Sequence, residues 1–426
     1  MKLIRKILVA LSLLVAPCLT YAITLDECQR LARENYPLVR QFDLIRQSTE
    51  FTIDNIAKGW LPQVSALAQA TYQSKVMNLP APLNHMLQQQ CLDAKGIRND
   101  QYRIGVDISQ NIWDGGQMDG QKAIAQAQAA AQSAETESNL YAIRQRVNDL
   151  YFGILLIDDK LRLNKELQTL LQSNLDKLNS MLKHGVVMQS DVNLIKAEEL
   201  KARQTETELS SSKKAMEDML SLFICQPFSG VEMPADIMVI AQGNSRPELH
   251  VFDSQLKVFD AQEQMLKVKL MPRVNAFAQG YYGYPGYDLY NDIFSHKWTL
   301  NGIIGVKAVW NISGLYTNKN DKLRLQTQRD QVETARETFL FNNHILATQQ
   351  NDAIARYTQL LQQDGEIVKL REEVRKTAES KLGHGVIDIN DLLQEITREN
   401  QARIDMSTHQ IQKLKETYDL QFTTNN

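Results

Sequence analysis

The feature that most constrains this chain is an internal duplication. Residues 61–72 and 271–282 are identical at six of twelve positions and lie 210 residues apart. Downstream the offset falls to 200 residues, because one intervening loop is ten residues shorter in the second half. A tandem repeat that keeps its order over such a stretch indicates two copies of one structural unit. The pairs at the second offset include Gly105/Gly305, Leu182/Leu382, His184/His384, Gly185/Gly385, Val186/Val386, Asp191/Asp391, Glu199/Glu399 and Arg203/Arg403.

Each repeat contains two short segments in which apolar and polar residues alternate. In the first repeat they begin at Val64 and Tyr102, and in the second at Val274 and Ile304. Each run is about ten residues long with aromatic residues near its ends, which is typical of transmembrane β-strands. A soluble antiparallel sheet with one wet face has the same alternation, so the strands alone leave both interpretations open.

Long helical segments follow each strand pair and favour the transmembrane interpretation. Residues 117–183 contain no proline and are rich in good helix formers. At 1.5 Å per residue such a helix reaches about 100 Å, far beyond a globular domain. The leucines from Leu171 to Leu182 are spaced as a seam for a neighbouring helix. The second repeat has a similar long segment at 317–382.

We therefore predict a mixed α and β membrane protein built as a tandem structural repeat. Each repeat begins with a polar helix, continues with a β-hairpin and ends with a long α-helical hairpin. The polar helix is expected to stack on the shorter return helix, so that two short helices match one long helix. The first repeat is predicted at 23–240, with its β-hairpin at about 61–113 and its helical hairpin at 117–223. The second repeat is predicted at 241–426, with its β-hairpin at about 271–312 and its helical hairpin at 317–422.

The strand count predicts an oligomer. Four strands cannot close a barrel, and lipid does not tolerate an open sheet edge. The smallest closed membrane barrels have about 8 strands, and closed rotational symmetry is usual in homo-oligomers. Three copies supply twelve strands, so we expect a homotrimeric 12-stranded β-barrel joined to an α-helical barrel. Strand count by itself does not exclude a dimer.

Residues 1–22 are expected to be a secretory signal peptide. A basic head precedes an apolar run at 7–16, and a small-residue site ends at Ala22. The apolar run is shorter than the about 20 residues that a membrane helix needs. Cys18 would fit a lipoprotein, but Pro17 before it fits that interpretation poorly. The chain is therefore expected to leave the cytoplasm.

Composition and motifs argue against several classes of protein. A net charge of −3 and a pI near 6.2 provide no basic surface for nucleic acid. After the leader, Cys28, Cys91 and Cys225 form an odd set without zinc-site spacing. We expect Cys28 and Cys225 to be small apolar residues in helices, and Cys91 to be a loop thiol of unassigned role. No G-x-S-x-G, H-E-x-x-H or C-x-x-C motif occurs, so we predict no enzyme activity, cofactor or metal.

Four segments resemble the TolC family of outer-membrane efflux proteins: residues 23–32 (ITLDECQRLA), the strand exit at 110–116 (QNIWDGG), and the two helix turns at Gly185 and Gly385. The resemblance covers nearly the whole chain after the leader. It implies a homotrimer in outer-membrane lipid with a periplasmic extension, acting as a passive exit duct of a tripartite efflux or type I secretion system. The implied partners are a periplasmic adaptor (membrane fusion protein) and an inner-membrane transporter of RND, ABC or MFS type.

The two turns are the predicted contact sites for the adaptor. In the family, a glycine in this turn contacts the adaptor hairpins at the periplasmic mouth. A glycine is also favoured at a helix C-cap, because it adopts a left-handed conformation without strain, and both roles are compatible. The flanking histidines would permit a pH-sensitive contact, although exposure to solvent is their commoner role. The predicted adaptor-contact residues are His184, Gly185, Val186, His384, Gly385 and Val386.

Asp191 and Asp391 each follow a turn glycine by six residues. The resemblance implies that acidic residues here line the narrow periplasmic entrance, help to close the resting channel and favour cations. In a trimer they would form a ring of six carboxylates, by the same physics as in other cation pores. The alternative is structural: each aspartate lies beside Ser190 or Asn390 in the first turn of a return helix, where a carboxylate stabilises the helix N-terminus.

The sequence departs from the family pattern at this entrance. Ile387 stands where a gate-locking arginine is expected, Gln394 replaces a second acidic residue, and Leu382 occupies an aromatic position. The usual tyrosine–arginine–aspartate bonds are therefore not expected. The main alternative function is an exported adhesin or coiled-coil stalk without channel activity, which explains the long helices and the export but not the duplicated β-hairpins.

Overall fold

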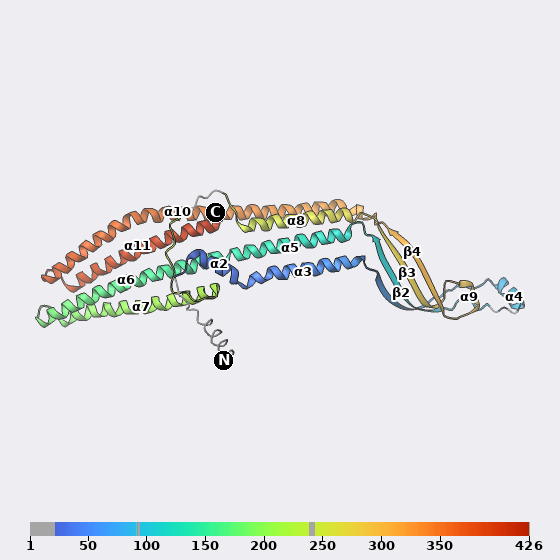
Figure 1. The fold of residues 1–426 in the computed structure, drawn as a ribbon, viewed down its shortest axis with the longest axis horizontal. Coiled ribbons are helices and arrows are strands. Elements are labelled where there is room, and N and C mark those ends of the chain that lie inside the picture. Colours follow the sequence, from blue (N-terminus) through green and yellow to red (C-terminus); the bar gives the residue numbers. More distant parts are fainter. Residues whose placement is uncertain (1–21, 91, 93, 238–242, 426) are drawn as a thin grey trace, which may run out of the picture. The chain divides into compact units, whose positions relative to one another are not determined.

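The structure is a computed structural model that describes residues 22–90, 92, 94–237 and 243–425 (Figure 1). The predicted signal peptide, except for Ala22, and Cys91 lie outside the described residues. The chain divides into two compact units, which we call the helical unit and the sheet unit. The helical unit comprises Met1–Phe42, Ala134–Val251 and Ala335–Asn426, and the sheet unit comprises Asp43–Ser133 and Phe252–Thr334.

Helices form most of the described chain, and α3, α5, α8 and α10 each have residues in both units. Only Ala142 separates α5 from α6. Among the residues described, no helix is both long enough and apolar enough to span a membrane. The main helices are α2 (Leu25–Asn35), α3 (Arg40–Ala57), α5 (Gln117–Tyr141), α6 (Ile143–Lys183), α7 (Gln189–Ile224), α8 (Pro247–Val268), α10 (Gly314–Gly383) and α11 (Ile389–Thr424), with short 3₁₀ helices at Pro37–Val39 and Lys58–Trp60.

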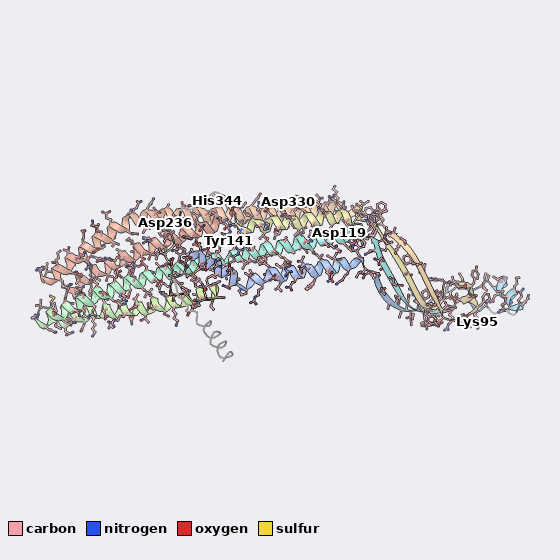
Figure 2. The ribbon with its side chains drawn as sticks, viewed as in Figure 1. Lys95, Asp119, Tyr141, Asp236, Asp330 and His344 are labelled. Carbon is pink, nitrogen blue, oxygen red and sulfur yellow. The ribbon has the colours of Figure 1, made fainter. Side chains whose placement is uncertain are left out.

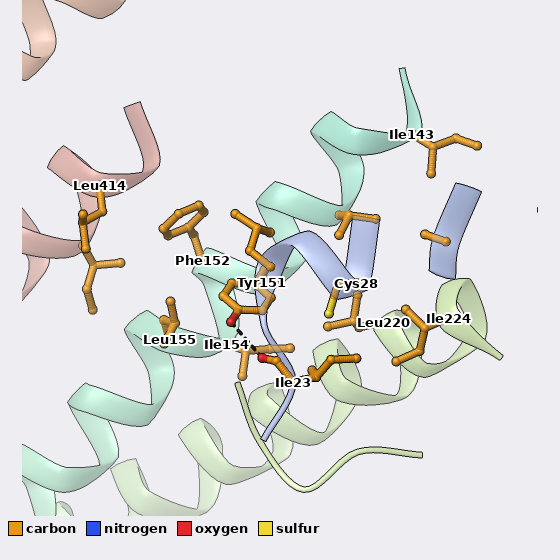
Figure 3. Close-up of a cluster of buried hydrophobic side chains, with 14 of the residues drawn as sticks. Ile23, Cys28, Ile143, Tyr151, Phe152, Ile154, Leu155, Leu220, Ile224 and Leu414 are labelled. Carbon is orange, nitrogen blue, oxygen red and sulfur yellow. Dashed lines mark hydrogen bonds between the residues drawn. The ribbon is translucent and has the colours of Figure 1, made fainter. Parts of the chain in front are cut away.

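One hydrophobic core of the helical unit surrounds Tyr151 on α6 (Figure 3). Tyr151 is fully buried, and its hydroxyl lies 2.9 Å from the Ile23 carbonyl oxygen and 2.7 Å from that of Glu232. Burial raises the pKa of this phenol above its usual value. Burial likewise raises the pKa of the Cys28 thiol to about 12, so Cys28 packs as the predicted small apolar residue. The same prediction is wrong for Cys225, which is exposed and caps the end of α7 with a left-handed φ of 54°.

A second hydrophobic core joins the two helical hairpins of this unit. The predicted leucine seam contributes Leu171 and Leu178, which are 2% and 1% exposed. Leu175 and Leu182 pack against this core while remaining partly accessible. The seam therefore faces a partner helix, as its spacing predicts. The other buried members are Val192, Ile195 and Ala202 from α7, Ala378 from α10, and Ile389, Leu392 and Ile396 from α11.

Tyr141, labelled in Figure 2, ends α5 and helps to fix the end of α11. Its hydroxyl donates to the Phe422 carbonyl oxygen at 2.7 Å, and the two rings stack with centroids 4.8 Å apart. The Arg246 guanidinium lies over both rings, 4.9 Å and 4.5 Å from their centroids. These contacts satisfy a carbonyl group that a helix end leaves without an intrahelical partner, and they place a cation on two aromatic faces.

The sheet unit contains one antiparallel sheet with the strand order β1–β2–β3–β4. The alternating residues point to opposite faces, as a period of two requires. Strands β2 and β3 join the two repeats, with Asp107 opposite Gln279, and their register shifts between Asn111 and Trp113. The strands are β1 (Gln63–Tyr72), β2 (Asp100–Trp113), β3 (Arg273–Tyr284) and β4 (Thr299–Val309).

Two loops at one end of the sheet pack against each other. One contains α4 (Ala81–Gln89) and the other contains α9 (Leu289–Phe294). The Tyr284 hydroxyl accepts from the Arg98 N–H and donates to the Asp292 carbonyl oxygen, both at 3.2 Å. The change of offset between the repeats falls in these loops, so the duplication did not predict their helices.

Candidate functional site

The two predicted turns have the same backbone geometry. Both are Schellman motifs, in which two N–H groups beyond the helix end bond back to carbonyls of the last turn. The turn glycines have φ values of +73° and +69°, in the left-handed region. A Cβ at either glycine would meet no atom within 4 Å, so the backbone conformation and not a lack of space selects glycine. The bonds are Gly185 N–H to Leu182 (3.0 Å), Val186 N–H to Met181 (3.0 Å), Gly385 N–H to Leu382 (3.0 Å) and Val386 N–H to Lys381 (2.9 Å).

The predicted adaptor-contact side chains lie exposed on these turns. Val186 is 62% exposed and Val386 is 68% exposed. His184 and His384 are also exposed, and Nδ1 of His384 lies 2.8 Å from the Ser380 carbonyl oxygen of its own helix. Within the described helical unit, both turns therefore present an accessible apolar residue beside a histidine.

Asp191 and Asp391 both occupy the first turn of a return helix, but their local roles differ. The Asp191 carboxylate accepts the Met188 N–H at 2.9 Å and so helps to cap α7. At the second turn Asp388 is the N-cap, and its carboxylate accepts the Asp391 N–H at 3.0 Å. No hydrogen bond or ion pair engages the Asp391 carboxylate within the described part of the chain, and Asp391 is exposed.

Asp388 is an acidic residue that the comparison of the repeats missed. Its counterpart in the first repeat is Met188, so the duplication pattern gave no signal for it. The D-x-x-D spacing before an apolar helix was the available signal, because aspartate is favoured at an N-cap. The second turn therefore carries Asp388 and Asp391, whereas the first carries only Asp191.

Replacing Asp388 by alanine is expected to destabilise the start of α11 by about 1 kcal/mol, because its carboxylate caps a backbone N–H. Replacing Asp391 by alanine should cost less, since no hydrogen bond of its side chain is lost within the described residues. Hydrogen exchange of the first turn of α11, followed by mass spectrometry, measures the difference. Equal exchange rates in the two variants would show that the capping assignment is wrong.

Apolar contacts occupy the positions where the family pattern expects locking bonds. Leu382 and Ile387 are half-buried and pack against the second hydrophobic core. Gln394 is exposed on α11. The departures seen in the sequence therefore fit a turn region held by side-chain packing at Leu382 and Ile387.

Farther from the turns, a buried ionic network links α10 to α11. The Arg375 guanidinium bonds to the Glu399 carboxylate, and to Glu379 at 2.8 Å. Glu399 also accepts a hydrogen bond from Nε of Arg403 at 2.9 Å, and Nη2 of Arg403 lies 2.8 Å from the same carboxylate oxygen as an ion pair. Asn174 on α6 donates to Glu379 at 3.4 Å, which connects the network to the other helical hairpin.

The carboxylates of this network stabilise the positive charge of Arg375. Burial alone would lower the pKa of the Arg375 guanidinium, but Glu399 and Glu379 outweigh that effect and raise it. The arginine is therefore a permanent cation between two carboxylates. No group of three or more histidine, cysteine, aspartate or glutamate side chains that could hold a metal ion occurs among the residues described.

Comparison with known proteins supports a single family. Residues 29–222 match the sequence model of the family described as "Outer membrane efflux protein". No curated protein matches the chain. Similar solved structures include the outer-membrane channel OprN, with a TM-score of 0.67, 14% identity, and coverage of 94% of this chain and 89% of that one. The outer membrane protein VceC from Vibrio cholerae has a TM-score of 0.66 and 13% identity, with 94% and 96% coverage.

A third solved structure, the open state of the MtrE outer membrane channel of Neisseria gonorrhoeae, has a TM-score of 0.62 and 14% identity. It covers 94% of this chain and 89% of that one. At such identities these likenesses establish the fold alone. Together they show that this chain has the fold of these outer-membrane channels and that its residues 29–222 are similar to the outer membrane efflux protein family.

Proposed function

We propose that this chain is an outer-membrane efflux channel whose helices extend into the periplasm, and that it is the exit duct of a tripartite efflux or type I secretion system. Three copies would form a 12-stranded β-barrel in outer-membrane lipid and a periplasmic α-helical barrel. The duct itself is passive. A periplasmic adaptor (membrane fusion protein) and an inner-membrane transporter of RND, ABC or MFS type would open it and supply the cargo.

The observation that carries this proposal is the four-stranded sheet with two open edges. Among the described residues, β1 pairs only with β2, and β4 pairs only with β3. Lipid does not tolerate such edges, and four strands are too few to close on themselves. The free edges belong to strands of 10 and 11 residues, so β1 of one copy can pair with β4 of the next over nearly their whole length.

The apolar face of the sheet supports its placement in lipid. Val64, Ile304 and Val306 are 65%, 84% and 67% exposed on this face. A contiguous exposed apolar surface is costly in water and is typical of a surface that contacts lipid or protein. Strands that place apolar residues outward and polar residues inward are characteristic of membrane barrels.

The helix turns support the proposed adaptor contact. His184, Gly185 and Val186 form one accessible turn. The matching residues of the second repeat form another with the same hydrogen bonds. We assign the entrance to Asp191, Asp391 and the newly recognised Asp388, whose carboxylates would number nine in a trimer and would favour cations by the physics of acidic rings in other pores.

Purified protein reconstituted in a planar lipid bilayer is expected to conduct ions. In a separate experiment, the crosslinked protein should migrate as a trimer in gel electrophoresis. An adhesin or coiled-coil stalk could also form a trimer but would carry no current, so the absence of conductance would reject the channel function. Growth assays with the gene deleted would then test efflux directly, through increased sensitivity to exported compounds.

The Asp191→Asn, Asp391→Asn double variant is expected to lose part of its preference for cations, because each trimer loses six carboxylates at the proposed entrance. Adding Asp388→Asn should deepen the loss. The reversal potential in a KCl gradient measures this preference. Asp43→Asn, which removes an exposed carboxylate on α3, is the matched control. A reversal potential that stays at the control value would refute the entrance assignment while leaving the channel intact.

A further inference from the structure

The polar face of the sheet carries an unequal set of charges. This face is formed by the odd-numbered residues of the four strands, which the strand register aligns. Its ionisable side chains are Arg103, Asp107, Arg273 and Lys307, three cations against one carboxylate. On the other face the strands contain only Asp100, which forms an ion pair with Arg98 at 2.5 Å. The excess positive charge therefore belongs to the polar face.

The register places Arg103, Asp107 and Lys307 at three levels along the strands, and Arg273, opposite Val309, lies two residues from the Lys307 level. On β3, Asn275 lies opposite Lys307, Gln279 opposite Asp107, and Gly283 opposite Arg103. Successive levels are thus four residues apart, or about 14 Å at about 3.4 Å per residue. Salt screens charges over about 8–10 Å at ionic strengths of 0.1–0.15 M. The single carboxylate is therefore too far away to neutralise either cation level.

The four side chains are also available to a passing ion. None of them has an ion-pair partner among the residues that the structure describes. Arg103 lines a hollow on this face together with uncharged polar and aromatic side chains. Gly283 opposite it must be glycine, because a Cβ would lie 2.2 Å from the Tyr102 carbonyl oxygen. The other polar lining residues of the hollow include Gln69, Thr71, Gln73, Gln101, Tyr281 and Tyr287.

We infer that the polar face of this sheet favours anionic solutes, with Arg103 and Lys307 as the residues that set this preference. The inference rests on the proposed function, because the face lines a water-filled passage only when the sheets of three copies close. Each trimer then carries a ring of three Arg103 side chains and a ring of three Lys307 side chains. The barrel and the acidic helix turns bias permeation in opposite directions, so each partly masks the other.

The experiment measures the reversal potential of the full trimer in a KCl gradient across a planar bilayer. The Arg103→Gln, Lys307→Gln double variant is expected to lower the chloride-to-potassium permeability ratio by at least about twofold for each ring removed, from the Coulomb interaction of three charges at about 10 Å in water after screening by salt. The Arg103→Lys, Lys307→Arg variant keeps both charges and should leave the ratio unchanged. The loss should be clearest in the Asp191→Asn, Asp391→Asn background, where the opposing bias is reduced.

A second variant keeps the test decisive if the double variant fails to assemble. Gln69→Glu places a new carboxylate on the same face, directly opposite Arg103, and should also lower the ratio. A conducting trimer whose reversal potential moves in neither the Gln69→Glu nor the Arg103→Gln, Lys307→Gln variant overturns the inference alone. An unaltered protein that carries no current overturns the proposed function, and the inference with it.

Discussion

Replacing Arg375 by methionine is expected to lower the free energy of unfolding by about 3 kcal/mol, the low end of the range for breaking a buried pair, because Glu379 loses its cation whereas Glu399 keeps Arg403. The side chain of Arg375 is 10% exposed and that of Glu399 is 6% exposed. Methionine keeps much of the apolar stem of arginine, so the loss reports mainly the missing charge and hydrogen bonds. Chemical denaturation of the detergent-solubilised protein, followed by far-ultraviolet circular dichroism, measures the change.

Arg371→Met provides the matched control for this prediction. Arg371 lies one turn earlier on α10, is 42% exposed, and pairs with Glu395 at 3.5 Å. Glu395 is 16% exposed but also pairs with Arg398 at 2.5 Å, so the replacement leaves it a cation and should cost about 0.2–1 kcal/mol, as for a surface pair. Similar losses in the two variants would mean that the Arg375 network does not stabilise the contact between α10 and α11 more than a surface pair does.

Leu178→Ala is expected to cost about 2–5 kcal/mol, the range for removing a buried leucine and leaving a cavity. Leu178 is 1% exposed and belongs to the core that includes residues of α7 and α11. Because this core lies close to both turns, we also expect faster hydrogen exchange at residues 181–188 and 381–388. Thermal unfolding measured by circular dichroism gives the stability change, and mass spectrometry gives the exchange.

The control for this variant is Leu222→Ala on α7. Leu222 is 79% exposed in the chain, so its truncation removes little buried surface. If Leu178→Ala unfolds at the same temperature as the control, the leucine seam does not hold the hairpins together. Faster exchange restricted to the turns, with unchanged unfolding, would instead indicate that the core acts only locally.

The sequence could predict the repeated elements because each has a strong periodic pattern. The leucine seam from Leu171 to Leu182 faces a core, and the alternating runs after Val64 and Val274 form paired strands. The role of the turn glycines could also be predicted, because a left-handed residue at the end of a long helix is most often glycine. Such features depend on local periodicity and backbone conformation, which a single sequence records directly.

Other features depended on contacts between distant segments. Arg375 corresponds to Leu175 in the first repeat, and a lone arginine on a helix is usually a surface residue. Only the fold brings Glu379, Glu399 and Asn174 around it. The charge excess on the polar face needed the strand register, since Arg103 and Lys307 belong to different repeats and lie on non-adjacent strands.

The two turns of one protomer share their hydrogen bonds but differ in charge, since Met188 precedes one return helix and Asp388 the other. A trimer built as proposed would offer six docking positions of two alternating kinds. An adaptor with a single type of basic hairpin would therefore bind with two affinities and fill the Asp388 positions first. Saturation of the duct would then proceed in two steps, with half of the positions occupied at a lower adaptor concentration than the rest.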